Sequence, residues 1–294
     1  MLGRLRKLLE MIRFSHTLFA LPFALLAAVM AWAANARGDP PIAFRGRDLA
    51  GIVACMVCAR SAAMAFNRLA DRRLDALNPR TANRHLPTGT LSVAGVVLFT
   101  AVSSLGFVAG TLLFLPNRVP LYASVPVLLF LFAYSLTKRF TVLSHLWLGT
   151  ALALAPVAAW VALRPELHWA PVLLGSAVML WVAGFDVIYA CQDTEFDVRM
   201  RLYSVPARFG VAGALRLAAV CHLGMVVLLS TVPVVYDEFG WVYLAGVASI
   251  GVLLVYEHAL VRPDDLTRVN RAFFHVNAVV SIGLLLIGTL DLLI

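Results

Sequence analysis

Apolar stretches of about 20 residues recur along the whole chain, and they limit its possible folds more than any other feature. Such a stretch matches the hydrocarbon core of a bilayer, where every backbone polar group needs a partner within the protein. The stretches are continuous rather than alternating with a period of two, which indicates helices and not barrel strands. We expect nine membrane-spanning helices, near residues 15–34, 49–67, 91–115, 119–137, 143–163, 169–190, 211–233, 240–261 and 273–294.

The composition agrees with this interpretation. Of the 294 residues, 61% are hydrophobic and only 14% are charged, whereas about a quarter of the residues in a soluble domain are charged. The sequence therefore predicts an all-α integral membrane protein whose partner is the lipid bilayer, with a single domain over residues 1–294. The net charge of +8 is explained by basic loops on one side of a membrane, so no nucleic-acid partner is expected.

The distribution of arginine and lysine predicts the orientation. With the N-terminus in the cytoplasm, 17 basic residues lie in cytoplasmic segments and five lie in external loops. Because basic loops are retained on the cytoplasmic side, we expect a cytoplasmic N-terminus and an external C-terminus. The expected location is the bacterial inner membrane, with a multi-pass chain whose active site faces the cytoplasm.

Acidic residues gather at the ends of two expected spans. Six of the 16 lie after the second or near the end of the sixth span: Asp71, Asp75, Asp186, Asp193, Glu195 and Asp197. Both spans run in the same direction, so both acidic ends reach the same face of the membrane. Their separation by four helices favours two pseudo-repeated halves around a central cavity, with a site between the halves.

The spacing of these residues points to a hard cation. Asn67, Asp71 and Asp75 are four residues apart and share one helix face, and Asp193 and Asp197 have the same spacing. Neighbouring carboxylates repel each other unless a cation lies between them. Oxygen ligands without histidine or cysteine favour Mg²⁺ over zinc, and Mg²⁺ commonly completes its shell with substrate phosphates. The two groups together predict a diphosphate-binding site.

Basic residues on the same side of the membrane suit a diphosphate. The candidates are Arg68, Arg72, Arg80, Arg84, Lys138 and Arg139. The alternative, that these residues only set the membrane orientation, stays open for each arginine. The large apolar interior favours a diphosphate with a lipid tail. Departure of the diphosphate would leave an allylic cation, which Tyr134 or Tyr189 would stabilise through its ring while water is excluded.

Three segments resemble the UbiA superfamily of intramembrane prenyltransferases. "NRLADRRLDALNPRTANRHLPTG", from Asn67 to Gly89, is similar to its first signature, and "DVIYACQDTEFDVRMRLYSVPARFG", from Asp186, to its second. "YSLTK", ending at Lys138, resembles the element between them. Two segments, "IRFSHTLFALPFALLAA" near the start of the chain and "ACQDTEFD" within the second signature, are most similar to the 4-hydroxybenzoate polyprenyltransferase-like branch. Members of this branch often serve menaquinone synthesis.

The resemblance implies an enzyme with a specific chemistry. A polyprenyl group is transferred from its diphosphate to an aromatic acid, 4-hydroxybenzoate or a dihydroxynaphthoate, in the synthesis of ubiquinone or menaquinone. The implied Mg²⁺ ligands are Asn67, Asp71, Asp75, Asp193 and Asp197, and the implied catalytic residues are Asp186, Lys138 and Tyr134. Asp186 would orient the acceptor or take up its ring proton. Arg13 or His16 would meet the acceptor carboxylate, although an interfacial anchor explains Arg13 equally well.

Two positions depart from the family pattern. His85 stands where proline is usual, and "RMRLYS" before Val205 is bulkier than the usual glycine-containing turn. Both departures fall in expected cytoplasmic loops, where they affect loop shape and acceptor entry more than metal binding.

Two other classes of membrane protein also carry acidic residues in or beside their helices. A membrane CDP-alcohol phosphotransferase needs one contiguous motif that begins D-G-x-x-A-R, and this chain lacks it. An ion-coupled transporter also uses intramembrane carboxylates, but typically near the bilayer midplane and beside broken helices. Prenyl transfer accounts for both acidic helix ends.

Overall fold

A computed structural model describes residues 2–12, 19–34, 42–269 and 272–294 of the chain. Within these ranges the regular structure is helical, without strands, apart from one isolated β-bridge. The expected all-α class is therefore confirmed. The chain divides into two compact units, one of residues 1–17 and 46–136 and the other of residues 18–45 and 137–294. The single-domain organisation over residues 1–294 stays a prediction.

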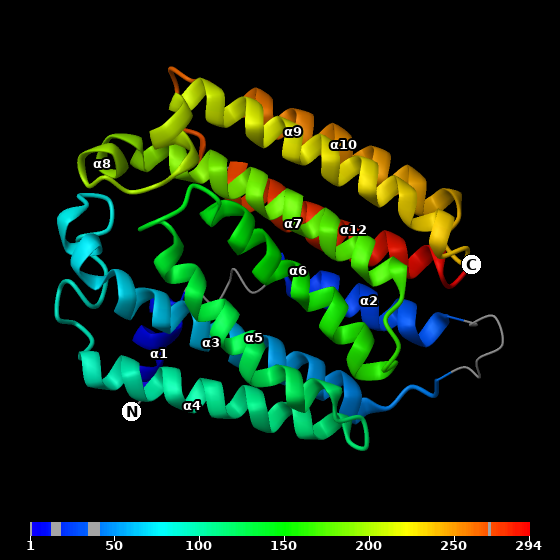
Figure 1. The fold of residues 1–294 in the computed structure, drawn as a ribbon. Helices are drawn as coiled ribbons and strands as arrows, with labels where there is room; N and C mark the ends of the chain where they lie inside the picture. The colour runs from blue at the N-terminus through cyan, green and yellow to red at the C-terminus, as the bar shows by residue number, and fades with distance from the viewer. Residues whose placement is uncertain (1, 13–18, 35–41, 270–271) are drawn as a thin grey trace. The chain divides into compact units, whose positions relative to one another are not determined.

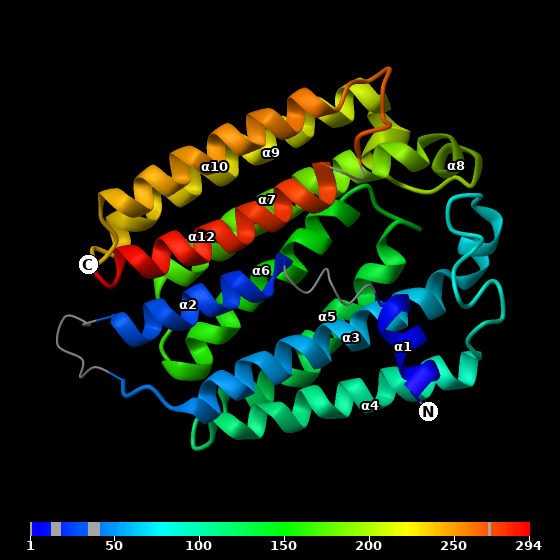
Figure 2. The same cartoon turned by 180° about the vertical axis from the view of Figure 1, so that it is seen from behind.

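The first unit is built around one long helix, α3 (Gly46–Leu77). Helix α4 (Val93–Thr111), extended by the 3-10 turn η2 (Leu112–Phe114), packs along α3, as Figures 1 and 2 both show. A Cβ atom at Gly51 would lie 2.8 Å from the Phe114 ring, so glycine permits this close approach. The unit also contains α1 (Leu2–Met11) and α5 (Val119–Thr137). Phe66 of α3 stacks on Phe132 of α5 at 4.5 Å between ring centroids.

The second unit is organised around α7 (Trp169–Ala190), which packs between α6 (Ser144–Leu163) and α9 (Val205–Val235). The 3-10 turn η3 (Cys191–Asp193) and the short helix α8 (Thr194–Arg199) continue α7. The other elements are α2 (Leu21–Ala33), α10 (Trp241–Leu260), a π-helical turn η4 (Ala272–Val276) and α12 (Asn277–Asp291). In the view from behind in Figure 2, α10, α12 and α2 are nearest the viewer.

Glycines let the helices of the second unit approach closely. A Cβ atom at Gly149 of α6 would overlap the backbone carbonyl of Met179 in α7. A Cβ atom at Gly184 of α7 would overlap the His222 ring of α9. Small residues at such contacts are characteristic of helices packed within a membrane, where hydrophobic burial does little to drive association.

A buried polar network joins four helices of the second unit. Trp181 Nε1 donates to Asn277 Oδ1 at 2.7 Å, and Asn277 Nδ2 donates to Glu257 Oε1 at 3.3 Å. His222 Nδ1 and His258 Nε2 are 3.0 Å apart. The network fixes the relative register of α7, α9, α10 and α12, because each polar group needs its partner in an apolar interior.

Eight helices among the described residues are long and apolar enough to cross a membrane. Large apolar side chains on their surfaces stay exposed, as Val97, Leu98, Val102 and Leu105 do on α4, which suits contact with lipid. These eight correspond to the second to ninth expected spans. Helix α2 corresponds to the first and has 13 residues, Leu21–Ala33, and residues 15–18 of that expected span lie outside the described ranges. The cytoplasmic position of the N-terminus stays a prediction.

Two expected boundaries need correction. Helix α3 continues without a break to Leu77, ten residues beyond the expected end at residue 67, because its polar last turns form hydrogen bonds of their own. Helix α9 begins at Val205 rather than at residue 211. Its first turn is set off from the rest by Gly210, whose φ of 69° lies in the left-handed region that favours glycine.

Candidate active site

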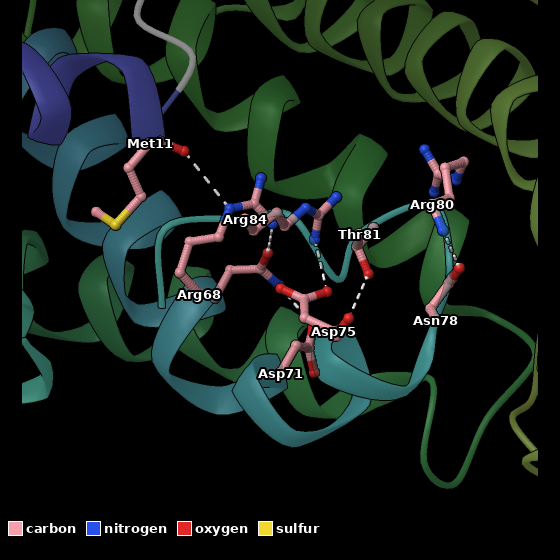
Figure 3. A network of polar contacts seen from close by, with 9 residues as sticks. Met11, Arg68, Asp71, Asp75, Asn78, Arg80, Thr81 and Arg84 are labelled. Carbon is pink, nitrogen blue, oxygen red and sulfur yellow. Dashed lines mark hydrogen bonds and ion pairs between the residues drawn. The ribbon is translucent and has the colours of Figure 1, made fainter. Parts of the chain in front are cut away.

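The last turns of α3 carry the first acidic motif, shown in Figure 3. Asn67 Nδ2 donates to Asp71 Oδ2 at 3.0 Å, which confirms that these side chains share one helix face. Because the Asn67 amide donates through nitrogen, its oxygen is turned away from Asp71 and accepts from Arg68 Nη1 at 3.2 Å. The first two oxygen-bearing residues of the motif are thus already oriented by the protein.

Asp75, one turn further along α3, is buried, and its two carboxylate oxygens differ. Oδ1 accepts from Arg84 Nη1 at 2.7 Å, whereas Oδ2 has no hydrogen-bond partner among the described residues. The Asp75 backbone carbonyl accepts from Thr81 Oγ1 at 3.0 Å. Figure 3 shows Arg84 and Thr81 reaching back to Asp75 from the loop that follows α3. The loop therefore holds Asp75 in place and leaves one of its oxygens for a cation.

The other arginines of this segment occupy distinct places. Arg68 is buried and its Nε atom donates to the Met11 carbonyl at 3.5 Å, so it joins α3 to the end of α1. Arg72 is exposed on α3. Arg80 is exposed in the loop, where its backbone N–H donates to Asn78 Oδ1 at 2.9 Å, and Figure 3 shows it apart from the carboxylates. Arg84 forms an ion pair with a carboxylate of the motif, that of Asp75.

His85, which replaces the usual proline, contacts a residue of α1. Its Nε2 atom lies 3.9 Å from Glu10 Oε2. The hydrogen bond from Arg6 lowers the pKa of the Glu10 carboxyl, and the charges of Arg6 and His85 lower it further. Glu10 thus stays ionised at neutral pH beside the His85 ring. The substitution gives the loop a polar link to α1 that proline cannot form.

The second acidic motif does not form a continuous α-helical face, in contrast to the expectation from its spacing. Asp193 ends the 3-10 turn η3 and is the N-cap residue of α8, whereas Asp197 lies in the last turn of α8. The helix changes its winding here, so spacing alone does not fix the directions of these two side chains. Asp193 and Asp197 are both buried, and Asp197 Oδ2 has no hydrogen-bond partner in the described chain.

The bulky turn after α8 is a Schellman motif with arginine in the glycine position. Leu202 N–H donates to the Asp197 carbonyl at 2.8 Å, and Arg201 N–H donates to the Val198 carbonyl at 3.2 Å. Arg201 has a φ of 55°. Tyr203 N–H then donates to the Lys138 carbonyl at 2.7 Å, and this bond ties the turn to the chain between α5 and α6.

The remaining predicted residues divide into three groups. Lys138 lies in the second unit with Asp186 and Asp197, and its carbonyl accepts from Tyr203 in the turn that follows Asp197. Tyr134 is half-buried near the end of α5, and Arg139 is exposed in the following turn. Arg13 and His16 lie outside the described residues.

Sequence reasoning missed two residues of interest. His145, at the start of α6, is 2% exposed, and its Nδ1 atom lies 2.7 Å from Asp186 Oδ2. Arg60 lies two turns before Asn67 on α3, and its buried Nε atom has no hydrogen-bond partner among the described residues. A spacing of seven residues places Arg60 and Asn67 on one face of the helix. A polar or charged residue inside an apolar stretch was the available signal for both.

The acidic motifs have the donor chemistry of a Mg²⁺ site. Each unit, taken by itself, contains one buried carboxylate oxygen without a hydrogen-bond partner in the described ranges, Asp75 Oδ2 in the first and Asp197 Oδ2 in the second. Burying such an oxygen is costly unless a cation or donor satisfies it. Among the described residues, no group of three or more histidine, cysteine, aspartate or glutamate side chains is arranged to hold a metal ion by itself. Carboxylate and amide oxygens are the donors that fit Mg²⁺, which takes few protein ligands together with phosphate and water.

Comparison with known proteins establishes the family. The model of the UbiA prenyltransferase family matches residues 20–279. The chain belongs to the UbiA prenyltransferase family. The predicted resemblance and the expectation of a prenyltransferase are thereby confirmed.

Curated relatives of this UbiA-family chain include a 4-hydroxybenzoate octaprenyltransferase of Nitrosomonas eutropha. It is 33% identical over 237 residues, which cover 77% of this chain and 79% of the relative. A protein of the same description from Coxiella burnetii is 34% identical over 241 residues, which cover 80% and 81% of the two chains.

Solved UbiA structures share the fold. The apo structure of a UbiA homologue from Aeropyrum pernix K1 has a TM-score of 0.80 and 32% sequence identity, and the match covers 92% of this chain and 95% of the homologue. A UbiA homologue from Archaeoglobus fulgidus bound to DMAPP and Mg²⁺ has a TM-score of 0.70 and 19% identity, with 98% and 99% coverage. This second likeness shows the fold alone.

Proposed function

We propose that this protein transfers a polyprenyl group from its diphosphate to an aromatic acid in a Mg²⁺-dependent reaction. The single observation that carries the proposal is a pair of buried carboxylate oxygens that lack a hydrogen-bond partner among the described residues. They are Asp75 Oδ2 and Asp197 Oδ2, in the motifs that resemble the two family signatures. Family membership favours this reaction over the phosphotransferase and the transporter considered above. The names of the curated relatives favour 4-hydroxybenzoate as the acceptor.

Separate sets of side chains bind Mg²⁺ and the diphosphate. Asn67, Asp71, Asp75, Asp193 and Asp197 hold Mg²⁺, which when bound supplies the positive charge that stabilises the departing diphosphate. The basic residues Arg68, Arg72, Arg80, Arg84, Lys138 and Arg139 bind the diphosphate oxygens. Arg84 also orients Asp75 through their ion pair, and Arg68 also orients Asn67.

The proposed reaction is an electrophilic substitution on the aromatic ring of the acceptor. The C1–O bond of the allylic diphosphate breaks, and its electron pair leaves with the diphosphate. A ring carbon of the acceptor then forms the new carbon–carbon bond, and the ring proton passes to the Asp186 carboxylate. Tyr134 presents an aromatic face to the allylic cation while the apolar surroundings exclude water.

The acceptor carboxylate needs a cation in this apolar environment. Arg13 and His16 remain candidates for that contact. Arg60 is a further candidate, because its guanidinium lies within a membrane-spanning helix and its Nε atom lacks a partner in the described chain. It lies about 10 Å along the helix axis from Asn67, since seven residues separate them and each rises about 1.5 Å.

A membrane assay tests the proposal. Membranes containing the protein are incubated with geranylgeranyl diphosphate or a longer homologue, Mg²⁺, and either 4-hydroxybenzoate or 1,4-dihydroxy-6-naphthoate, and products are identified by mass. We expect the prenylated 4-hydroxybenzoate. Product from the naphthoate alone would keep prenyl transfer and move the protein to menaquinone synthesis. No product and no consumption of diphosphate would refute the function.

A cellular location in the bacterial inner membrane, with the site open to the cytoplasm, completes the proposal. A soluble aromatic acid would arrive from the cytoplasm, and the prenylated product would leave into the bilayer. The test uses Asn83→Cys and Asp237→Cys, each made in a chain whose four native cysteines are replaced by serine or alanine. Labelling from each side of sealed vesicles tests the orientation, with position 83 expected on the cytoplasmic side.

A further inference from the structure

We propose that His145 is a positioning residue that holds the Asp186 carboxylate ready to accept the ring proton. The inference rests on the proposed function, in which Asp186 receives that proton. It adds a residue that neither acidic motif contains. His145 begins α6, whereas Asp186 lies near the end of α7, 41 residues further along the chain.

The contact between the two side chains is short and almost wholly buried. His145 Nδ1 lies 2.7 Å from Asp186 Oδ2, and the side chains are 2% and 15% exposed. A hydrogen bond to a carboxylate is stronger in such surroundings than in water, and leaving either group without a partner would be costly. The pair therefore has a defined geometry rather than a shifting surface contact.

The backbone determines which imidazole nitrogen carries the proton. Val205 N–H points to His145 Nε2, with 3.4 Å between the nitrogen atoms. A backbone amide can only donate, so Nε2 must be the unprotonated nitrogen and Nδ1 must carry the hydrogen. His145 therefore donates Nδ1–H to Asp186 Oδ2, and Asp186 accepts as a carboxylate.

This arrangement commits one Asp186 oxygen and leaves the other available. No hydrogen bond reaches Oδ1 of Asp186 from any described residue. A proton acceptor needs such a free oxygen with a fixed direction. His145 need not itself gain or lose a proton, because the ring proton ends on Oδ1 while Nδ1–H stays on the imidazole.

His145 also links Asp186 to the second acidic motif along the backbone. Val205 is the first residue of α9, and its neighbour Ser204 caps that helix by accepting from Ala207 N–H at 3.3 Å. The preceding residue, Tyr203, is bonded to Lys138. The position of Asp186 is thus coupled to the turn after Asp197 and to the chain that carries Lys138.

The test compares two amides of different length. In His145→Asn, the side-chain N–H can take the place of Nδ1–H, whereas the longer amide in His145→Gln reaches toward the place of Nε2. We expect His145→Leu and His145→Gln to lower kcat by about 10- to 100-fold, below the roughly 100- to 10,000-fold loss for removing a general base itself. His145→Asn should recover most of the activity, and the KM for the prenyl diphosphate should stay unchanged in all three.

A matched control and a double variant separate positioning from folding. Ser144→Ala changes the neighbouring buried residue, whose hydroxyl has no hydrogen-bond partner among the described residues, and should leave kcat unchanged. His145→Leu added to Asp186→Asn should cause no further loss, because the first change already removes the group that His145 orients. Thermal unfolding in detergent reports whether each variant is folded.

The outcomes distinguish this inference from the function on which it rests. An inactive wild-type protein would refute the proposed function. An active wild-type protein with equal kcat in His145→Asn, His145→Gln and His145→Leu would overturn the role of His145 alone. Additive losses in His145→Leu and Asp186→Asn would overturn it as well.

Discussion

Arg84 reaches back from the loop after α3 and donates to Asp75, with 2.7 Å between Nη1 and Oδ1. The two side chains are 24% and 9% exposed, so the ion pair is more shielded than a surface contact. One oxygen of Asp75 is thereby fixed while the other stays without a partner in the described chain. This relationship makes the loop part of the proposed metal site.

Arg84→Ala should lower turnover by about 10- to 100-fold, the usual cost of removing a group that orients a metal ligand. The loss should be accompanied by a change in the Mg²⁺ concentration that gives half-maximal activity, because Asp75 loses its fixed direction. Titration of turnover with Mg²⁺ measures both effects. Arg73→Ala, an exposed position on the same helix, is the control and should behave as wild type. Equal behaviour of the two variants would separate Arg84 from metal binding.

The acidic motifs should be indispensable. Asp71→Ala and Asp193→Ala are each expected to abolish turnover while the protein still folds, because a Mg²⁺ ligand is lost in each. EDTA should stop the wild-type reaction, and added Mg²⁺ should restore it. Glu195→Gln, which changes an exposed carboxylate beside the second motif, should retain activity. Near-normal turnover in either aspartate variant would exclude that residue as a ligand, and turnover in excess chelator would exclude the metal.

Arg60→Leu should raise the KM for the aromatic acid and leave the KM for the prenyl diphosphate unchanged. The expected rise is about tenfold or more, since a charge-assisted hydrogen bond is worth about 1.5–3 kcal/mol. Initial rates at varied acceptor and fixed diphosphate measure the effect. Arg60→Lys keeps the charge and should lose less. A rise in both KM values would place Arg60 in the diphosphate site instead.

Gly149→Ala should destabilise the second unit by about 1–3 kcal/mol, because the added methyl group overlaps the Met179 carbonyl of α7. Gly283→Ala is the matched control, since nothing lies within 4 Å of its added Cβ atom. It should stabilise α12 by up to about 1 kcal/mol through helix propensity. Thermal unfolding in detergent compares the two. An unchanged midpoint in Gly149→Ala would mean that α6 and α7 separate readily.

Arg201→Gly should stabilise the turn after α8 by about 1 kcal/mol, the usual cost of a left-handed conformation for a residue with a side chain. Arg201→Ala removes the same charge and keeps the strained φ, so it should give no such gain. Unfolding midpoints of the two variants separate strain from charge. Equal midpoints would show that the strain is absorbed elsewhere.

The sequence predicted those features that depend on residues close to one another along the chain. The shared face of Asn67 and Asp71 follows from helical spacing, and eight of the expected spans are helices because their apolar stretches are long. Contacts between distant segments were not accessible in this way. The contact of His145 with Asp186 depends on how α6 packs on α7, and the ion pair of Arg84 depends on the fold of an irregular loop. The winding change at Asp193 likewise follows from packing, not from spacing.

The length of α3 affects how a lipid substrate can be held. Its 32 residues correspond to a rod of about 48 Å at about 1.5 Å per residue, well beyond the roughly 30 Å of hydrocarbon in a bilayer. A helix of this length extends beyond the hydrocarbon core to the level of the lipid phosphates. Asn67, Asp71 and Asp75 occupy its final third. A prenyl diphosphate floating in the bilayer carries its charged head at that same depth. The diphosphate of the proposed substrate can therefore bind these residues while it stays outside the hydrocarbon core.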